Sequence, residues 1–162
     1  MTIRAAEARD VPAIRGHWND VIRDTLISFK HEEMGEDDVA AYLAARAAAG
    51  HPFFVAELGG MVVGFATYFQ FRGGSGYAHT LEHSIMLGAA ARGQGLGRKL
   101  LISLEDHARS SGHHSLFAGV SSANPAGRAF HAAMGYEEIT TLREVGFKWG
   151  RWLDLTLMQK IL

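Results

Sequence analysis

Residues 84–101, SIMLGAAARGQGLGRKLL, carry the strongest structural signal in the sequence. The stretch opens with apolar residues, three glycines follow at 93, 95 and 97, and leucines then recur at helical spacing. This pattern predicts a strand that runs into a glycine-rich turn and then into an amphipathic helix. Backbone N–H groups at such a turn point outward unpaired, and the helix dipole adds partial positive charge. The turn is therefore an anion cradle, most often for phosphate.

Three phosphate-binding motifs compete for this turn. A dinucleotide fingerprint requires a glycine where the chain has Arg98, and an acidic residue about 20 positions later that is also missing. A P-loop requires Gly-Lys followed by Ser or Thr, whereas Gly97 is followed by Arg98 and Lys99. The spacing that fits is Arg92-x-x-Gly95-x-Gly97. It resembles the pyrophosphate-binding motif of the GNAT N-acetyltransferases.

The resemblance narrows to one group of that family and covers nearly the whole chain, from Ile3 to Leu162. Three segments carry it: YAHTLEHS at 77–84, NPAGRAFHAAMGY at 124–136 and GFKWGRWLD at 146–154. They resemble the phosphinothricin and methionine sulfoximine acetyltransferases, and the last segment resembles the methionine sulfoximine branch in particular. The resemblance implies an enzyme that transfers an acetyl group from acetyl-CoA, its cosubstrate, directly to the amino group of a small amino-acid analogue in a ternary complex.

The rest of the chain predicts helices and strands in the order αα-βββ-α-β-α-ββ, with one further strand at 2–5. We expect helices over 11–22, with Asp10 as cap, and over 36–49, 96–111 and 125–134. Strands are expected over 53–58, 61–71, 79–87, 116–121, 137–145 and 152–161, with a flexible loop at 72–76. The fold class is α/β (α+β): a single mixed, mostly antiparallel twisted sheet flanked by helices. The resemblance implies the acetyl-CoA N-acyltransferase fold, in one N-acetyltransferase domain over 1–162.

Length and composition restrict the function classes. The chain has 162 residues, of which 48% are hydrophobic and 20% charged, and a formal net charge of −1. These values fit one domain that buries a core, and they provide no overall positive field for nucleic acid. No apolar run approaches the ~20 residues of a membrane helix, and the N-terminus is too polar for a signal peptide. With 0 Cys, thiolate metal sites and cysteine nucleophiles are excluded. We expect a cytoplasmic protein with no nucleic-acid or membrane partner.

Glu82 and His131 are the candidates for proton transfer. Glu82 lies in the strand that leads into the cradle, where a partly buried carboxylate can act as a general base, directly or through water. The alternative is a solvated strand glutamate. His131 lies seven positions after the expected helix cap Asn124. As a neutral imidazole it can accept a proton and as an imidazolium donate one, and the sequence leaves both open. The resemblance implies that Glu82 is the base and that His131 faces the cofactor sulfur.

The resemblance also implies an acetyl-CoA site. Backbone groups of Ile85, Met86 and Leu87 are expected at the pantetheine amides, with their side chains in the core. Asn124 caps a helix and also suits a contact with the pantetheine arm. N–H groups would hold the pyrophosphate over the run Arg92, Gly93, Gln94, Gly95, Leu96, Gly97, Arg98 and Lys99. For the last two side chains, simple solvation is the alternative.

Three residues are candidates for acceptor binding. Arg72 matches a basic position that, in the family, faces the anionic groups of the substrate, and a guanidinium forks well onto a carboxylate. Phe29 matches an aromatic wall of the pocket, with core packing as the alternative, and Tyr77 is a third candidate. The chain departs from its relatives at two positions. Gly74 replaces a second basic residue of the phosphinothricin enzymes, and Ala78 replaces an arginine of the methionine sulfoximine branch.

Other classes of protein also fit parts of the sequence. His79-x-x-Glu82-His83 matches an inverted zinc-protease motif, with Glu82 as base and the histidines as ligands. That motif requires a helix, whereas 77–87 predicts a strand, so we expect no metal site. A non-catalytic acyl-CoA-binding module and an acetyltransferase of the same fold that modifies a protein N-terminus or lysine remain open.

The last hairpin suggests self-association. Phe147, Trp149 and Trp152 lie in a glycine-flanked turn between the two final strands. Aromatic residues at a turn often anchor an interface. The resemblance implies a homodimer in which this end of the chain lies near the partner's pocket.

Overall fold

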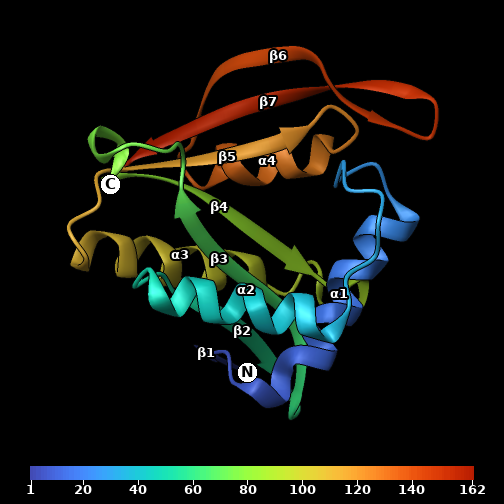
Figure 1. Cartoon of the computed structure of the whole chain (residues 1–162), viewed down its shortest axis with the longest axis vertical. Coiled ribbons are helices and arrows are strands. Elements are labelled where there is room, and N and C mark those ends of the chain that lie inside the picture. Colours follow the sequence, from blue (N-terminus) through green and yellow to red (C-terminus); the bar gives the residue numbers. More distant parts are fainter.

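A computed structural model describes residues 1–162 and contains one seven-stranded sheet with the strand order β1-β2-β3-β4-β5-β7-β6 (Figure 1). The strands are β1 (Thr2–Ala5), β2 (Phe53–Leu58), β3 (Met61–Gln70), β4 (Thr80–Leu87), β5 (Ser115–Ser121), β6 (Glu137–Lys148) and β7 (Arg151–Ile161). The helices are α1 (Val11–Asp24), α2 (Glu36–Ala48), α3 (Leu96–Ser110) and α4 (Pro125–Ala133). The predicted element order and mixed sheet are confirmed, including the strand at 2–5.

The sheet is antiparallel except at one pair, β4 with β5. That pair is short: its register runs from Thr80 opposite Ser115 to His83 opposite Ala118. Beyond this point β4 continues along β3 as far as Leu87, and β5 continues along β7 as far as Ser121. The two strands therefore part in the middle of the sheet, and neither is the other's partner over the second half of β4.

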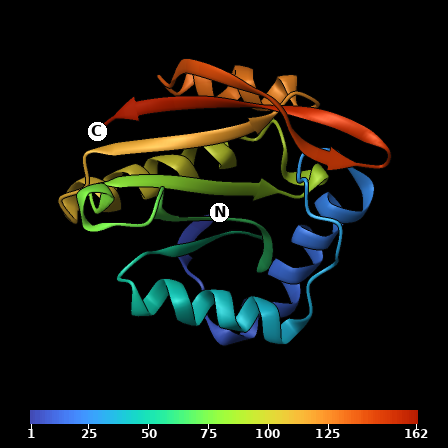
Figure 2. The same cartoon turned by 45° about the horizontal axis from the view of Figure 1, so that its top comes forward.

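Helices cover both faces of the sheet (Figures 1 and 2). On one face α1 and α2 pack against Phe53, Val55 and Phe65 of β2 and β3. On the other face α3 buries its leucine stripe against β2–β5, and the end of α4 joins the same core through Met134. Successive strand residues alternate between these two cores, because side chains of a strand point to opposite faces with a period of two.

The termini of several elements differ from the sequence prediction. β6 continues to Lys148, beyond the expected end at 145, and pairs with β7 around a turn in which Trp149 and Gly150 both have positive φ. Positive φ at both central residues is typical of a type I′ hairpin turn, which the alternating pattern does not reveal. Asp10 lies before α1 as expected, yet its side chain does not cap the helix and instead pairs with Arg4 at 2.7 Å.

The glycine-rich loop after β3 holds more structure than the expected flexible loop. Ser75–Tyr77 form one turn of 3₁₀ helix, and the Gln70 side chain donates hydrogen bonds to the carbonyl oxygens of Arg72 and Gly74. Because Gln70 is the last residue of β3, the loop is anchored to the end of the sheet. No helix of the structure is both long and apolar enough to cross a membrane.

Candidate functional site

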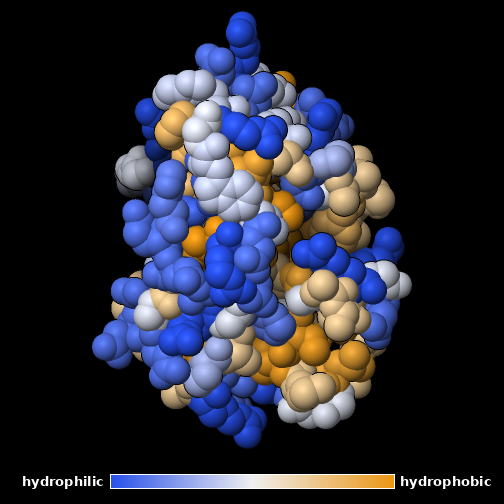
Figure 3. Space-filling model, turned by 90° about the vertical axis from the view of Figure 1, so that its right-hand side faces the viewer, coloured by the Kyte–Doolittle hydropathy of each residue, from blue (hydrophilic) through white to orange (hydrophobic).

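A continuous passage begins at the glycine turn and runs to Glu82 through the gap between β4 and β5. Its outer part is lined by the turn together with Leu87, Ala126 and Phe130. Its middle lies between Ile85–Leu87 of β4 and the start of α4, and its inner part ends at Glu82 and Gly119. Neighbouring parts share lining residues: Leu87 and Phe130 join the first two, and Asn124 and His131 join the last two. Figure 3 shows a recessed hydrophobic seam on the side of the molecule where β4 ends.

The glycine turn has the backbone geometry of an anion cradle. Gly93 and Gly95 have φ of 74° and 76°, a region that side chains disfavour, and Gly95 is the N-cap of α3. No side chain caps this helix, so the N–H groups of its first turn remain free to bind an anion. A Cβ at Gly97 would lie 3.2 Å from Leu87 and 3.4 Å from Phe130, so a larger residue would require these side chains to shift where α3 starts against β4 and α4. Arg92 and Arg98 both line the outer part of the passage, and both are exposed, as is Lys99.

The middle of the passage is bordered by backbone groups of β4 and by the side-chain amide of Asn124. Ser84–Leu87 have no partner on β5, so the edge of β4 that faces the gap can bond an extended ligand. The cap at Asn124 is confirmed: its side-chain oxygen accepts a hydrogen bond from the N–H of Gly127 at 2.9 Å. The same residue lines the passage, so it both starts α4 and borders the gap. Most of the predicted cofactor residues thus border one path, whereas Gln94 and Lys99 of the turn lie outside its lining.

Glu82 lies at the point where the strands part, on the face of the sheet that carries α1 and α2. Its register partner on β5 is Phe117, and its carboxylate extends towards Gly119, where a Cβ would lie 3.0 Å from Glu82 Oε1. The missing side chain leaves room for the carboxylate between the strands. Burial raises the pKa of Glu82 above its ordinary value. The carboxylate is therefore a stronger base than a solvated strand glutamate.

His131 reaches the passage from α4. Its Nδ1–H donates to the carbonyl oxygen of Gly127 at 2.7 Å, and its Nε2 is buried without a protein partner. The Gly127 bond fixes the neutral tautomer, so Nε2 carries a lone pair. Burial lowers the pKa of His131 below its ordinary value, although the bond to Gly127 acts in the opposite direction. The ring is therefore neutral at pH 7.

His83 points away from Glu82, into the core on the α3 and α4 side. Its ring lies 5.0 Å from the ring of His131 and 5.7 Å from that of Tyr136. Burial lowers the pKa of His83 to about 3, so it too is neutral. A second neutral imidazole beside His131 adds no charge that would disfavour protonation of His131.

The zinc-protease arrangement is not formed. Thr80–Leu87 is the expected strand, and adjacent strand residues point to opposite faces, so Glu82 and His83 cannot face one ion. His79 is exposed and its Nδ1 bonds the carbonyl oxygen of Gly112 at 2.9 Å. No group of three His, Cys, Asp or Glu side chains in the structure is arranged to hold a metal.

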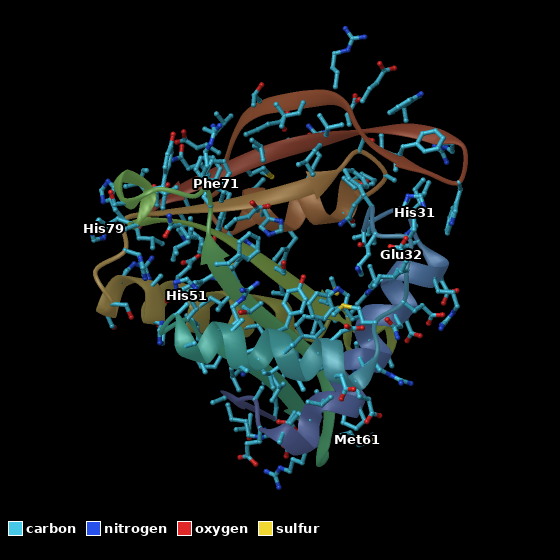
Figure 4. All side chains as sticks on the ribbon, viewed as in Figure 1. His31, Glu32, His51, Met61, Phe71 and His79 are labelled. Atoms are coloured by element: carbon cyan, nitrogen blue, oxygen red, sulfur yellow. The ribbon has the colours of Figure 1, made fainter.

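The three candidate acceptor residues do not border this passage. Phe29 packs on the backbone of β6, where a Cβ at Gly146 would lie 2.5 Å from its ring. Arg72 and Tyr77 are exposed neighbours on the loop before β4, with the guanidinium 6.0 Å from the ring centre. In Figure 4, Phe71 and His79 mark that loop at the end of the sheet opposite to His31. The residues of the segment after α1 that do border the inner passage are Ile27 and Ser28, next to Phe29 in the sequence.

Sequence reasoning missed several residues that shape the site. Gly119 is an isolated glycine inside a predicted strand, a pattern that can mark close approach of another group. Gly127 supplies the carbonyl that orients His131. The close approach of Glu82 to Gly119 depends on the β4–β5 register, which the sequence does not show.

The geometry of the glycine turn, the unpaired edge of β4 and the inner carboxylate fits a protein that binds a long phosphate-bearing ligand and has a carboxylate at the far end of the site. Comparison with known proteins assigns the class: the chain belongs to the acetyltransferase (GNAT) family, whose profile matches residues 18–136. The L-methionine sulfoximine/L-methionine sulfone acetyltransferase of Salmonella typhimurium is 39% identical over 159 residues, covering 98% of this chain and 92% of that protein.

Solved structures agree. The ribosomal-protein-alanine N-acetyltransferase from Brucella melitensis superposes with a TM-score of 0.97 at 41% identity, covering 100% of both chains. The structure of yncA from Salmonella typhimurium with its cofactor acetyl-CoA superposes with a TM-score of 0.96 at 39% identity, covering 100% of this chain and 94% of that one. The protein is an acetyl-CoA-dependent N-acetyltransferase, and its uncapped helix and open strand edge fit that cosubstrate.

The cradle yields a direct test. Gly95→Glu places a side chain and a negative charge at the N-terminus of α3, so we expect acetyl-CoA binding, measured by titration calorimetry, to be abolished. Gly112→Glu is the matched control: Gly112 follows α3, has φ of 80°, and has nothing within 4 Å of its Cβ position, as is true of Gly95. It should bind acetyl-CoA as the parent protein does. Equal losses in both variants would contradict an anion site at Gly95.

Proposed function

We propose that the protein transfers the acetyl group of acetyl-CoA to the amino group of a small amino-acid analogue of the methionine sulfoximine, methionine sulfone or phosphinothricin type. Transfer is direct, in a ternary complex. The observation that carries this is the passage itself: the cradle and Glu82 lie at its two ends, so a cosubstrate held at the cradle can present its acyl end beside a base. Acetyl-CoA, when bound, supplies the thioester carbonyl and the thiol leaving group.

In this mechanism Glu82 removes a proton from the ammonium group of the acceptor, so that the resulting amine can attack the thioester carbonyl. Its buried position strengthens it for that role, because the raised pKa brings it nearer to the working pH. Gly119 keeps the carboxylate accessible from the acceptor side. A general base must lie within hydrogen-bond reach of its proton, directly or through one water, and the inner passage places Glu82 where an amine can approach.

His131 contributes on the cofactor side of the sheet. Because its Nδ1–H is held by Gly127 and its pKa lies below the ordinary value, it offers a lone pair at Nε2 rather than a proton. We therefore assign it an acceptor role: it orients polar groups at the acyl end of the passage, takes up the second proton that the acceptor nitrogen loses on amide formation, and returns it to the thiolate that leaves. The lowered pKa of His131 disfavours the alternative left open by the sequence, a histidine that is protonated at the outset and acts as general acid.

Substitution of Glu82 tests the base. Glu82→Gln preserves shape but cannot accept a proton, so turnover should fall ~10²–10⁴-fold while the dissociation constant of acetyl-CoA stays unchanged. In the parent enzyme, kcat/KM should rise with pH as Glu82 ionises, and the raised pKa moves this rise above the range of an ordinary carboxyl group. In Glu82→Gln that rise should be absent, with activity recovering at high pH where the free amine is abundant. Unchanged turnover at neutral pH would make Glu82 a structural residue.

The size of the inner cavity favours a small acceptor. It measures about 210 Å³, below the ~300–1,000 Å³ typical of pockets for drug-sized ligands. Ile27 and Ser28 close it on the α1 side. For recognition of the acceptor's anionic groups, Arg72 and Tyr77 remain our candidates. Their exposed position outside the passage requires them to act from its rim or from a second subunit, and Phe29 would act by supporting the wall formed by its neighbours.

Acetylation of a protein N-terminus is a second candidate, favoured by the likeness to the Brucella melitensis enzyme. A panel of amines, with thiol release from acetyl-CoA as the readout, decides between a small-molecule and a protein acceptor. We expect methionine sulfoximine, methionine sulfone and phosphinothricin to be acetylated and peptides with N-terminal alanine to be inert. The converse pattern would assign the protein acceptor, and no thiol release with any amine would leave an acyl-CoA-binding module.

We further propose a homodimer in the cytoplasm, where acetyl-CoA is available. Strand β6 is a free edge of the sheet, and the β6–β7 hairpin exposes Phe147, Trp149 and Trp152, the last two by 57% and 64%. The rings of Phe147 and Trp152 lie 4.8 Å apart and form one apolar surface. An exposed edge with such a surface is typical of an interaction site.

Light scattering tests the dimer. The parent protein should have twice the mass of one chain, and the double variant Phe147→Asp with Trp152→Asp should be monomeric. Met61→Asp is the control, because Met61 is also an exposed hydrophobic residue but lies at the distant β2–β3 turn (Figure 4). A parent protein of monomer mass would refute the proposal.

A further inference from the structure

Lys148 is the most deeply buried cation of the structure that has no acidic partner. Lys148 is the last residue of β6 and is 1% exposed, whereas its neighbours Phe147 and Trp149 are exposed. The ring centre of Trp149 lies 5.2 Å from Lys148 Nζ. Its ammonium donates to three carbonyl oxygens, those of Ile22 at 2.6 Å, Thr25 at 2.8 Å and Ser28 at 2.9 Å. An ammonium has three donors, so its hydrogen-bonding capacity is filled by backbone alone.

The acceptors are the end of α1 and the segment that follows it. The last four carbonyls of a helix have no partner within the helix, and a cation near that end is favoured by the helix dipole. Ile22 is one of these residues, because α1 ends at Asp24. Thr25 and Ser28 belong to the irregular segment beyond the helix, which lacks backbone bonding of its own between them. Lys148 therefore joins this segment to the helix end.

The segment held in this way is the acceptor-side wall of the passage. Ile27 and Ser28 line the inner cavity at Glu82, directly beside the carbonyls that Lys148 binds. One more bond fixes the wall from the other side of the gap, because Ser121 Oγ of β5 donates to the carbonyl oxygen of Leu26 at 2.7 Å. The wall is thus suspended between the end of β5 and the ammonium of Lys148.

The β6–β7 hairpin adds two supports to the same segment. The ring of Phe29 packs on the backbone of Gly146, and Nε2–H of His31 donates to the carbonyl oxygen of Phe147 at 2.7 Å. Figure 4 shows His31 beside this hairpin, at the same end of the molecule. Three consecutive residues of β6, Gly146–Lys148, therefore each contact the stretch from Thr25 to His31.

We propose that Lys148 is a positioning residue for acceptor binding: through three backbone carbonyls it holds residues 25–28 against Glu82, and so sets the size of the acceptor pocket. This inference deepens the proposed function and rests on it. Lys148 does not touch the reacting atoms and does not border the cradle. Its loss should therefore weaken acceptor binding without weakening acetyl-CoA binding.

The test is Lys148→Met, which keeps the length and apolar stem but removes the three donors. We expect the KM for the acceptor to rise about tenfold or more, because small displacements of a positioning wall have large effects on reactivity. kcat should change less than KM, and the dissociation constant of acetyl-CoA by calorimetry should stay within about twofold. Lys148→Gln, which retains part of the donor capacity, should give an intermediate KM.

Lys160→Met is the matched control. Lys160 Nζ also donates to a backbone carbonyl, that of Met134, at 2.8 Å, and it pairs with Glu105 at 2.7 Å, but on the α3 and α4 side of the sheet. The Lys160→Met variant should have a lower midpoint of thermal unfolding but an unchanged KM for the acceptor. A KM increase of equal size in both variants would overturn a specific role for Lys148.

The outcomes separate the two proposals. If the parent protein acetylates no small amine, the proposed function fails. If the parent is active and folded Lys148→Met has an unchanged acceptor KM, this inference alone fails. Should Lys148→Met not fold, the same measurement is made on Ser121→Ala, which removes the opposite support at Leu26. An unchanged acceptor KM in Ser121→Ala then overturns the inference.

Discussion

The separation of β4 and β5 after their fourth residue pair is the constraint on which the rest of the structure depends. Two adjacent strands would ordinarily continue to share hydrogen bonds, and an unpaired edge inside a protein is costly unless another group bonds it. Here each strand keeps its other partner, β3 for β4 and β7 for β5. The separation therefore removes only the hydrogen bonds between β4 and β5. The gap turns a layer that would exclude ligands into one that a narrow ligand can enter. The cradle, the unpaired edge and Glu82 belong to one site because the passage that follows this gap is lined by all three.

The surroundings of three titratable side chains at the gap favour their neutral forms. Glu82 is hindered from ionising, and His131 and His83 are hindered from gaining charge, in each case because burial disfavours the charged form. All three shifts favour neutral side chains inside the passage. Permanent charge lies at its outer end, at Arg92 and Arg98, and at Lys148 behind the wall. A site of this kind can bind an uncharged thioester end without displacing tightly held ions.

Much of the fold was predictable from local patterns, because glycine, proline and leucine spacing report directly on turns and helix faces. The cradle at 92–99, the Asn124 cap and the strand around Glu82 follow from such patterns. The register of β4 against β5 is a long-range property, so the sequence could not place Glu82 beside Gly119. Lys148 was also hidden, since a lysine in a strand is ordinarily solvated, and its burial depends on where the end of α1 lies. The resemblance implies Phe29 and Arg72 at the acceptor site, with Tyr77 as a further candidate, and none of the three lines the passage in the structure.

The alternation of β4 has a further consequence for how the two substrates meet. Glu82 faces the layer of α1 and α2, while His83 and the start of α3 belong to the opposite layer. The gap between β4 and β5 therefore connects the two layers, because the inner cavity is lined by Ile27 and Ser28 on one side and by His83 and His131 on the other. Under the proposed function, acetyl-CoA and its acceptor would reach this gap from opposite layers. The sheet itself would then keep the two ligands apart except at their reacting ends.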